Sequence, residues 1–524
     1  MINRKFLYFV VFSSGMTTLA LEFSASRLLG GVFGTSNLVW ASVIGLILIY
    51  LTLGYFIGGP WADRSPYPKT LFRIIAWASF ISGLVPLISR PVLWVAADAF
   101  DTLQVGILLG SFSAVLVLFS LPVTLLGMVS PFAIRLAIRD QHEAGRVSGF
   151  IYAISTLGSF IGTFLPVLVL IPLVGTTWTF LIFSIFLLII ALVGLWLSCG
   201  WRSVLELSWM PVVLLIFAIF IANRPIKTTQ GQIYETESAY NYIQVVEQDE
   251  YRILRLNEGQ GQHSIWHPNQ IEFNGPWMQF IAAPFFNKPP FTVEDVESMA
   301  IVGLAAGTVA RQATEVFGAI PIDGFEIDPK IIQVGQEYFG MTQPNLNPIA
   351  KDGRIGLQQS ERQYTIIGID AYRPPYIPWH LTTQEYFQVV YDHLDTHGVM
   401  VINVGRSPKE RTLLEGLVST IQTVFPSVYV MNIPGTFNSI IYATKQSTQI
   451  ENLYQNLLAL YVEEDAPRIL VDAMQRIVVN LQPTQGDGMV FTDDWAPIEW
   501  ITNNMVLYYV MGGELEDMKE GMQE

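Results

Sequence analysis

The sequence contains very little cysteine, histidine and charge for its length. Cys199 is the single cysteine among 524 residues, which excludes an internal disulfide and a cysteine-based metal cluster. No metal site is predicted from the six histidines. Charged residues make up only 14% of the chain and hydrophobic residues 51%. That balance is typical of an integral membrane protein.

The few charges are unevenly distributed along the chain. Before Pro225 there are 12 Lys/Arg and 7 Asp/Glu, which leaves 17 and 37 of the totals of 29 and 44 for the rest. The C-terminal part therefore carries the acidic balance behind the net charge of −15. An acidic surface repels nucleic acid, so no nucleic-acid partner is expected. It favours cationic small molecules, or it simply keeps the domain soluble.

Long apolar stretches fill the first 225 residues. Seven of them approach the roughly 20 residues that cross a bilayer, at about 6–29, 37–59, 71–89, 104–128, 147–171, 177–199 and 207–223. Gly158 and Gly162 belong to a run of small residues that lets helix backbones approach closely. The sequence predicts an α-helical transmembrane bundle over 1–225, inserted in the lipid bilayer as a multi-pass protein of the cell membrane.

The orientation of this bundle presents a conflict. Basic residues precede the first span and follow the second and fourth, which puts the N-terminus in the cytoplasm by the positive-inside rule. Seven spans would then place the C-terminal part outside the cell. An enzyme that uses a nucleoside cofactor has to lie in the cytoplasm, where such cofactors are made. If the C-terminal part is such an enzyme, one span is miscounted, and we expect this part of the chain to be cytoplasmic.

From about Pro225 the pattern becomes that of a water-soluble α/β protein. A hairpin is predicted over 238–256 and a helix over 275–286. Further strands are predicted at 299–303, 321–327, 348–351, 364–369, 398–404, 427–432 and 438–444, and helices at 308–317, 329–339, 382–394 and 410–424. Alternation of strands and helices predicts a Rossmann-like sheet covered on both faces. The predicted domains are a small β domain at 226–290, the Rossmann-like domain at 291–450 and a helical, acidic tail at 451–524.

Candidate ligand-binding residues follow several of these strands. Such sheets bind ligands at the carboxyl ends of their strands. Gly303 and Gly307 form a turn in which no side chain keeps the backbone from a ligand. Glu326 ends the next strand, close to the spacing at which an acid accepts hydrogen bonds from ribose hydroxyls. The sequence therefore predicts a nucleoside-containing cofactor at this edge.

Three further segments carry candidate chemistry. Asp352, followed by Gly353, can accept a hydrogen bond from an adenine amino group or can cap a helix. Asp370 ends an apolar strand and can take a proton from an attacking amine. Near the C-terminus, the acidic run of 492–499 is either a cation-binding site or an acidic helix start.

Several of these segments together resemble spermidine synthase. The resemblance runs from about Ser238 to Thr444, and its specific pieces are SAYNYIQV at 238–245, LNEGQ at 256–260, FEIDP at 325–329, DG at 352–353 and YTIIGID at 364–370. The apolar N-terminal part and the DDWAP segment at 493–497 make the layout similar to membrane-bound spermidine synthase-like proteins of bacteria.

The resemblance implies a small β domain followed by a methyltransferase-type Rossmann sheet. It implies decarboxylated S-adenosylmethionine or S-adenosylmethionine as cofactor, a small-molecule amine as acceptor, and a homodimer. Glu326 would hold the ribose, Asp352 the adenine amino group, and Asp370 would act as the base. The resemblance also places Gln260 on the cofactor side. The other predicted cofactor contacts are Gly303, Gly307, Ile327 and Gly353, and the predicted substrate contacts are Tyr372, Asp494, Trp495 and Glu499.

Two departures from the family pattern concern the polyamine side of the site. The family's glycine turn carries an acid just before its last glycine, where this chain has Ala306. A Tyr-His-Glu stretch of the family lines the diamine pocket, where this chain reads Gly275-Pro276-Trp277. The nucleoside half of the pattern is kept, and the half that meets the polyamine has changed.

Three functions follow from these observations. The first is a membrane-anchored aminopropyltransferase that uses decarboxylated S-adenosylmethionine. The second is methyl transfer from S-adenosylmethionine to a lipophilic or amine acceptor. The third is a membrane transporter or complex subunit whose nucleoside-binding-type domain has no catalytic role, which the two departures and the orientation conflict favour.

Overall fold

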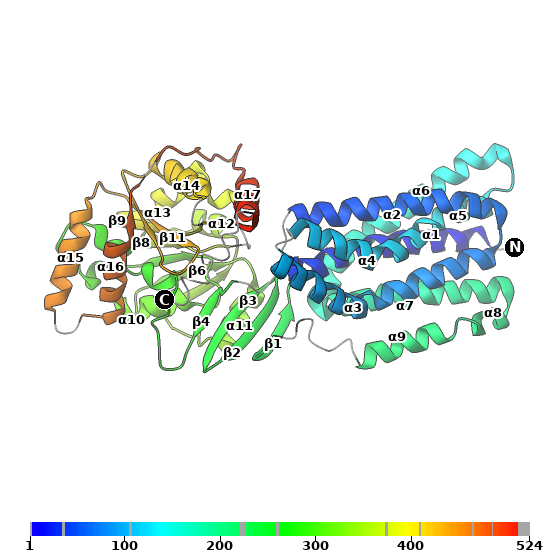
Figure 1. Cartoon of the computed structure of the whole chain (residues 1–524), viewed down its shortest axis with the longest axis horizontal. Helices are drawn as coiled ribbons and strands as arrows, with labels where there is room; N and C mark the ends of the chain where they lie inside the picture. Colours follow the sequence, from blue (N-terminus) through cyan, green and yellow to red (C-terminus); the bar gives the residue numbers. More distant parts are fainter. Residues whose placement is uncertain are drawn as a thin grey trace. The chain divides into compact units, whose positions relative to one another are not determined.

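The protein is described by a computed structural model. The structure describes residues 3–33, 37–103, 107–220, 227, 229–257, 261–372, 376–407, 410–463, 466–484 and 486–511. The chain folds into two compact units (Figure 1). The first contains 1–230 with 235–242 and 257–259, and the second contains 231–234, 243–256 and 260–524.

The first unit is a bundle of apolar helices. Its helices are α1 Arg4–Phe33, α2 Asn37–Arg64, α3 Pro68–Leu103, α4 Ile107–Gly127, α5 Val129–Ala137, α6 Ala144–Leu165, α7 Ile171–Cys199, α8 Trp201–Leu205 and α9 Trp209–Phe220. Within the described residues, six stretches are long and apolar enough to cross a membrane, judged by length and composition. They are Arg4–Gly31, Val39–Arg64, Pro68–Val92, Phe112–Ala137, Ala144–Cys199 and Trp201–Phe220.

One of these six stretches contains two of the seven predicted spans. Ala144–Cys199 has 56 residues, which as a straight helix would reach about 84 Å, against about 30 Å of hydrocarbon. The backbone at Gly175 leaves the helical region, with φ +83° and ψ 169°. Beyond it, the Glu237 carboxylate accepts hydrogen bonds of 2.5 Å from both the amide nitrogen and Oγ1 of Thr176. Glu237 therefore caps a helix that restarts after the bend.

Small residues bring α1 and α6 close together. A Cβ atom added at Gly158 would lie 2.0 Å from the carbonyl oxygen of Phe12, and one at Gly162 would lie 2.0 Å from that of Met16. Ser159 donates a hydrogen bond of 3.2 Å to the carbonyl oxygen of Gly15. The predicted small-residue packing is confirmed.

An antiparallel sheet of four strands precedes the larger sheet of the chain. Its strands, in spatial order, are β1 Gln232–Glu237, β2 Tyr242–Gln248, β3 Tyr251–Leu256 and β4 Ser264–Trp266. The helix predicted over 275–286 is wrong. Two short 3₁₀ turns, η3 Trp277–Gln279 and η4 Ala283–Phe286, lie there instead. Pro284 has no amide hydrogen and its ring crowds the preceding turn, which prevents one continuous helix.

The larger sheet has the order β12-β10-β11-β9-β8-β5-β6-β7. Its strands are β5 Met299–Val302, β6 Ile322–Glu326, β7 Leu346–Ala350, β8 Tyr364–Ile369, β9 Leu394–Gly405, β10 Ser427–Asn432, β11 Asn438–Thr444 and β12 Leu481–Gln482. Strands β9, β8, β5, β6 and β7 are parallel neighbours. Strand β11 runs antiparallel to both β9 and β10. The predicted Rossmann-like sheet is confirmed.

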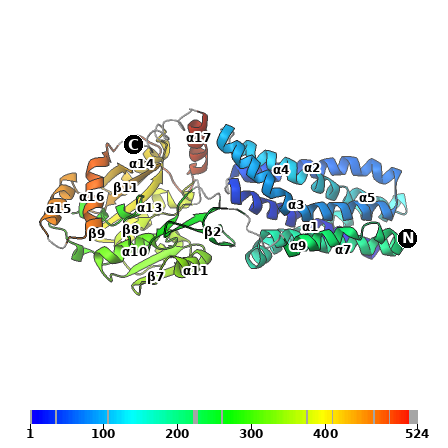
Figure 2. The same cartoon turned by 60° about the horizontal axis from the view of Figure 1, so that its bottom comes forward.

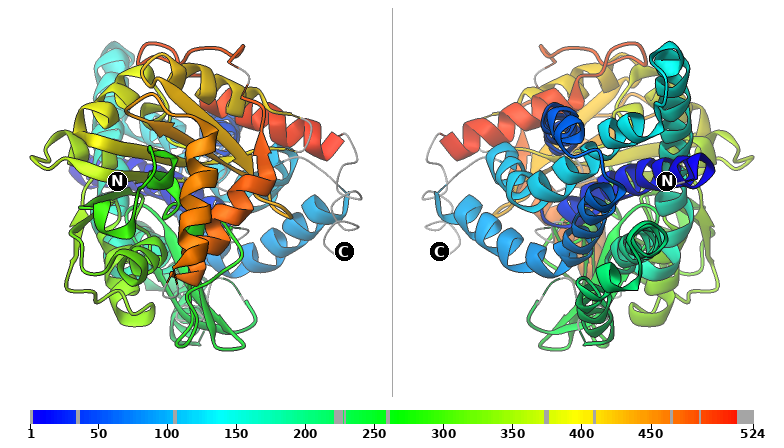
Figure 3. Two further views of the ribbon diagram at one scale, coloured as in Figure 1. Left: turned by 90° about the vertical axis from the view of Figure 1, so that its left-hand side faces the viewer. Right: turned by 90° about the vertical axis from the view of Figure 1, so that its right-hand side faces the viewer.

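Helices cover both faces of this sheet (Figure 2). They are α10 Thr308–Phe317, α11 Pro329–Tyr338, α12 Gly353–Gln358, α13 Gln384–His393, α14 Thr412–Gln422, α15 Ile450–Val462, α16 Arg468–Asn480 and α17 Ile498–Met511. Residues of α10, α15 and α16 share one apolar core with η3 and η4, and those of α13, α14 and α17 share another. Figure 3 shows α15 and α16 side by side. All six residues of β8 are buried, so it is the central strand of the sheet.

Candidate functional site

The carboxyl ends of four neighbouring strands bring the predicted residues together. Val302 of β5 is in register with Phe325 of β6 and with Ile369 of β8. The residue directly after β5 is Gly303, the residue directly after β8 is Asp370, and the last residue of β6 is Glu326. Asp352 lies two residues beyond the end of β7, the strand next to β6. The structure therefore brings these four residues to one edge of the sheet, and the roles that the resemblance implies for them stay predictions.

The turn after β5 depends on glycine at position 303. Gly303 has φ +89°, and a Cβ atom there would lie 2.5 Å from the carbonyl oxygen of Asp370. Its amide donates a hydrogen bond of 2.9 Å to the carbonyl oxygen of Phe325. Gly307, with φ +82°, closes the turn and precedes the first residue of α10. Any side chain at 303 would push the strand ends of β5 and β8 apart.

Glu326 is buried and bound to this turn. Its Oε2 accepts a hydrogen bond of 3.0 Å from the amide of Ala305, and its Oε1 accepts one of 3.1 Å from the amide of Asp328. Burial raises the pKa of Glu326 to about 7, against the opposing effect of these two amides. Each oxygen keeps a further lone pair for a hydroxyl donor. The next residue, Ile327, is 44% exposed and offers an apolar surface at the same edge.

Asp352 caps α12, as the alternative interpretation of this residue predicted. Its Oδ1 accepts hydrogen bonds from the amides of Arg354 and Ile355, at 3.0 and 3.1 Å. Its Oδ2 lies 2.9 Å from Nε2 of His380. The hydrogen bond from His380 is the main reason why the pKa of Asp352 lies below its ordinary value. Gly353 is required by packing, since a Cβ atom would lie 2.4 Å from the Val302 side chain.

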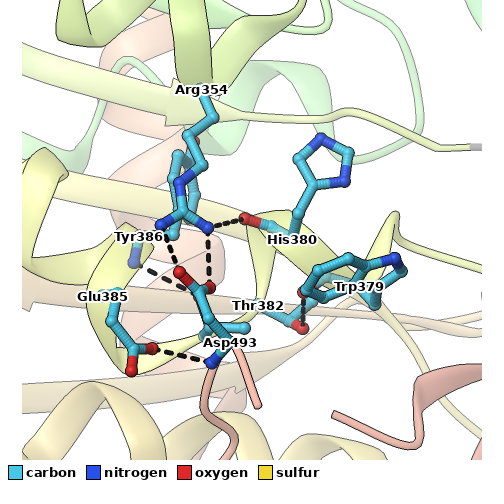
Figure 4. A network of polar contacts seen from close by, with 8 residues as sticks. Arg354, Trp379, His380, Thr382, Glu385, Tyr386 and Asp493 are labelled. Atoms are coloured by element: carbon cyan, nitrogen blue, oxygen red, sulfur yellow. Dashed lines mark hydrogen bonds and ion pairs between the residues drawn. The ribbon is translucent and has the colours of Figure 1, made fainter. Parts of the chain in front are cut away.

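Arg354 and Asp493 form the centre of a polar network (Figure 4). Arg354 donates two hydrogen bonds of 2.7 Å to the carboxylate of Asp493 and one of 3.1 Å to the carbonyl oxygen of His380. Asp493 also accepts a hydrogen bond of 2.7 Å from Thr383. Its own amide donates to Glu385 at 2.9 Å. The network ties the C-terminal segment to the loop that carries His380.

The C-terminal residues predicted to bind a cation lie on two successive elements, a turn at 492–495 and the start of α17. Asp493 is paired with Arg354, and Asp494 and Trp495 lie on an exposed turn, with Trp495 53% exposed. Backbone hydrogen bonds of 3.0 Å in both directions between Thr492 and Trp495 close this turn. Glu499 lies in the first turn of α17, which agrees with the alternative of an acidic helix start.

Asp370 has a partner that the sequence analysis missed. Its Oδ1 accepts a hydrogen bond of 2.9 Å from Nδ2 of Asn403 on β9. Asn403 is 5% exposed, and its Oδ1 has no hydrogen-bond partner among the described residues. Burial raises the pKa of Asp370 to about 6. In the sequence, Asn403 is the single polar residue of the apolar run Val401–Val404. This run belongs to β9, the strand beside β8.

Tyr372, predicted to bind substrate, connects two strand ends. Its hydroxyl donates a hydrogen bond of 3.1 Å to the carbonyl oxygen of Asn403 and accepts one from the amide of Gly405. Burial raises the pKa of Tyr372 well above its ordinary value. The hydroxyl proton is thus used within the protein, and Tyr372 positions the end of β9 next to Asp370.

Both departures from the family pattern lie among buried residues. Ala306 is buried, and its amide donates a hydrogen bond of 2.9 Å to Oγ of Ser264. Trp277 belongs to an apolar core. In the same turn, Gln279 is fully buried and neither polar atom of its side chain has a partner among the described residues. Gln260, predicted to line the cofactor site, lies outside the described residues.

Comparison with known proteins identifies the domain that carries this edge. The model of the family "Spermine/spermidine synthase domain" matches residues 287–456. A probable polyamine aminopropyl transferase of Bifidobacterium longum is 30% identical over 281 residues, which are 51% of this chain and 61% of that protein. The chain thus spans less than two thirds of this relative's length.

A second relative covers most of the chain. Polyamine aminopropyltransferase 2 of Aquifex aeolicus is 23% identical over 460 residues, which are 84% of this chain and 88% of that protein. Among solved structures, a probable spermidine synthase from Corynebacterium glutamicum has a TM-score of 0.39 at 16% identity, over 51% of this chain and 99% of that chain. Residues 287–456 thus match the family model of the spermine/spermidine synthase domain, and the chain is similar to polyamine aminopropyltransferases.

Proposed function

We propose that this protein is a membrane-anchored aminopropyltransferase that uses decarboxylated S-adenosylmethionine and a small amine acceptor. The observation that carries the proposal is the arrangement of Gly303, Glu326, Asp352 and Asp370 along one sheet edge, in the domain matched by the family model. The acceptor is an amine because Asp370 and the strongly acidic balance of the C-terminal part favour a cation.

The nucleoside side of the edge offers groups suited to an adenosine. Gly303 and Gly307 hold the turn after β5 in positive-φ conformations that residues with a side chain rarely adopt. Glu326, fixed by two backbone amides, has lone pairs left for the two ribose hydroxyls. Ile327, Asp352 and Gly353 are the proposed contacts of the adenine ring. When bound, the cofactor supplies a sulfonium, which makes the carbon beside it electrophilic.

The acceptor side is built around Asp370 and Asn403. The unpartnered Oδ1 of Asn403 is suited to accept a hydrogen bond from an amine N–H, and it orients the nitrogen lone pair. The amine nitrogen forms the new C–N bond as the C–S bond breaks, and the bonding electrons remain on sulfur. Asp370 takes the proton that the nitrogen loses. With a pKa of about 6, Asp370 is mainly ionised at neutral pH and still basic enough to accept this proton.

The polyamine end of the site is proposed to differ from that of the family. Ala306 contributes no carboxylate to the turn. Phe280, next to Gln279, packs on Gly368, since a Cβ atom added at Gly368 would lie 2.6 Å from its ring. Gly368 and Asp370 face the same side of the sheet because strand residues alternate. We therefore include the unpartnered amide of Gln279 among the acceptor-side groups.

The helical bundle is proposed to anchor the enzyme in the cell membrane, with the soluble part in the cytoplasm, where nucleoside cofactors are made. A homodimer is proposed from the family resemblance alone. Neither proposal changes the chemistry at the sheet edge.

The activity is tested with the full chain purified in detergent. It is incubated with decarboxylated S-adenosylmethionine and a panel of diamines and polyamines, and products are followed by mass spectrometry. We expect methylthioadenosine and an aminopropylated amine in equal amounts, and at least about a hundred-fold slower formation of both by the Asp370→Asn variant. Release of S-adenosylhomocysteine from S-adenosylmethionine, without methylthioadenosine in the first reaction, would favour methyl transfer instead.

A further inference from the structure

A cavity in the helical bundle combines a basic end with an apolar wall. It has a volume of about 900 Å³ and is lined by residues of α2, α3, α4 and α7 with the segment between α2 and α3. Lys69 and Arg73 lie at one part of its lining, and Leu121 and Leu125 of α4 at another. All of its lining residues belong to the first unit. The cavity therefore offers an amphipathic binding surface within the bundle itself.

Helix α3 supplies this cavity with a graded row of side chains. Lys69, Arg73, Trp77 and Ile81 all line it, and they follow one another at intervals of four residues. Residues at this spacing lie on one face of a helix. The row therefore passes from two cations through an indole to an aliphatic side chain. At 1.5 Å per residue it extends about 18 Å, which matches a lipid headgroup and the first part of its acyl chain.

The basic end has more positive than negative charge. Arg73 forms an ion pair with Glu206, and Nζ of Lys69 lies 3.8 Å from the other oxygen of the same carboxylate. Two cations thus share one anion. The neighbouring Asp63 is engaged by Arg135, at 3.0 Å, and does not compensate the second cation. Among the residues that the structure describes, one positive charge of this end therefore remains available for an anionic group.

Aromatic side chains mark this end as a membrane–water interface. Trp61, Tyr67 and Trp77 line the cavity and are 41%, 63% and 42% exposed. Tryptophan and tyrosine are enriched at the level of the lipid headgroups, where one end of the side chain is apolar and the other wet. The charges, the aromatic residues and the apolar wall thus follow the order in which a phospholipid presents its phosphate, glycerol and acyl chains.

We propose that this cavity binds an anionic phospholipid. Its phosphate would lie against Lys69 and Arg73, and an acyl chain would follow Ile81, Leu121 and Leu125. Basic pockets between transmembrane helices bind anionic headgroups in this way. One uncompensated cation corresponds to about a five-fold preference over a zwitterionic lipid. This site is separate from the proposed transferase chemistry and gives the bundle a ligand of its own.

The single cysteine of the chain provides the test. Cys199 is exposed and lines the cavity, so a bound lipid should shield its thiol. The full chain in mixed micelles is titrated with phosphatidylglycerol or with phosphatidylcholine, and the rate at which N-ethylmaleimide alkylates Cys199 is measured. We expect both lipids to slow alkylation, with a midpoint for phosphatidylglycerol about five-fold lower.

Two variants separate the site from a general effect of anionic micelles. The double variant Lys69→Gln with Arg73→Gln leaves only the Glu206 carboxylate at this end, so phosphatidylglycerol should bind no better than phosphatidylcholine, whose protection shows that the cavity is intact. The matched control Arg4→Gln breaks the ion pair with Glu143, which lies outside the cavity and does not involve Asp63, and it should keep the five-fold difference. Equal midpoints in the unchanged chain, no protection by either lipid, or a difference that persists in the double variant would each overturn the proposal.

Discussion

Replacing Asp370 by Asn should make the protein more stable and inactive at the same time. Burial raises the pKa of Asp370 from its ordinary value of 3.8 to about 6, so the folded state disfavours the carboxylate. The difference corresponds to at most about 3 kcal/mol of lost stability when the group is ionised. An Asn side chain carries no charge, and its Oδ1 can still accept the hydrogen bond from Asn403.

The pH dependence of this effect follows from its sign. Because the pKa of Asp370 is raised on folding, the cost is absent below about pH 4 and fully present above about pH 6. The Asn variant should therefore match the unchanged protein at pH 4 and exceed it by up to about 3 kcal/mol at pH 7. For a domain of this size, each kcal/mol shifts the melting temperature by about 2–4 °C.

The assay is thermal unfolding of the full chain in detergent at several pH values, followed by tryptophan fluorescence. Tyr372→Phe is the matched control, because it removes two neighbouring hydrogen bonds without removing a group that ionises in this range. Its effect on the melting temperature should not vary between pH 4 and pH 7. Aminopropyl transfer by Asp370→Asn should fall by about 10²- to 10⁴-fold. An Asn variant that is less stable at pH 7, or that keeps its activity, would refute the role of Asp370 as a buried base.

Four further changes test other parts of the edge. Gly303→Ala should abolish cofactor binding measured by calorimetry, since the added Cβ atom would lie 2.5 Å from the carbonyl oxygen of Asp370. An unchanged affinity would contradict the close packing of the turn against the end of β8. Glu326→Gln should weaken binding of methylthioadenosine by about ten- to a hundred-fold, as expected for losing hydrogen bonds to a charged group, without a comparable loss in melting temperature. Arg354→Lys loses the paired hydrogen bonds to Asp493 and should lower the melting temperature by only a few degrees, corresponding to about 1 kcal/mol. Gln279→Leu removes a buried side-chain amide that has no partner among the described residues, so the stability of the protein should be unchanged or higher. We expect this variant to have a higher KM for the amine. An unchanged KM would mean that Gln279 is a core residue without a role in binding the amine.

Much of the larger sheet could be predicted because its strands are continuous apolar runs separated by helical patterns. β8 is apolar along most of its length and buried on both faces, and the strand and helix bounds after residue 299 agree with the prediction to within a few residues. The helix predicted over 275–286 failed because its composition is apolar on all sides. Hydrophobicity alone does not distinguish a helix from the two 3₁₀ turns that prolines impose.

The candidate site could be predicted only in part from the sequence. Gly303, Glu326 and Asp370 each follow a predicted strand, so their convergence depends on local patterns and the rules of a parallel sheet. The pair of Arg354 and Asp493 joins positions 139 residues apart, and no spacing links them. Asn403 was overlooked because its role depends on which strand lies beside β8, which only the order of the sheet reveals. Local chemistry was predictable, and the partners supplied by tertiary contacts were not.

The central claim is that an adenosine binds at the carboxyl edge of the large sheet and is held there by Glu326. Calorimetric titration of the detergent-purified full chain with methylthioadenosine, which shares the adenosine of both candidate cofactors, tests it most directly. We expect saturable binding at one site per chain, weakened at least ten-fold by Glu326→Gln and unaffected by the lipid-site control Arg4→Gln. An absence of binding heat at pH 7 and 8, or equal affinity in the Glu326 variant, would contradict it.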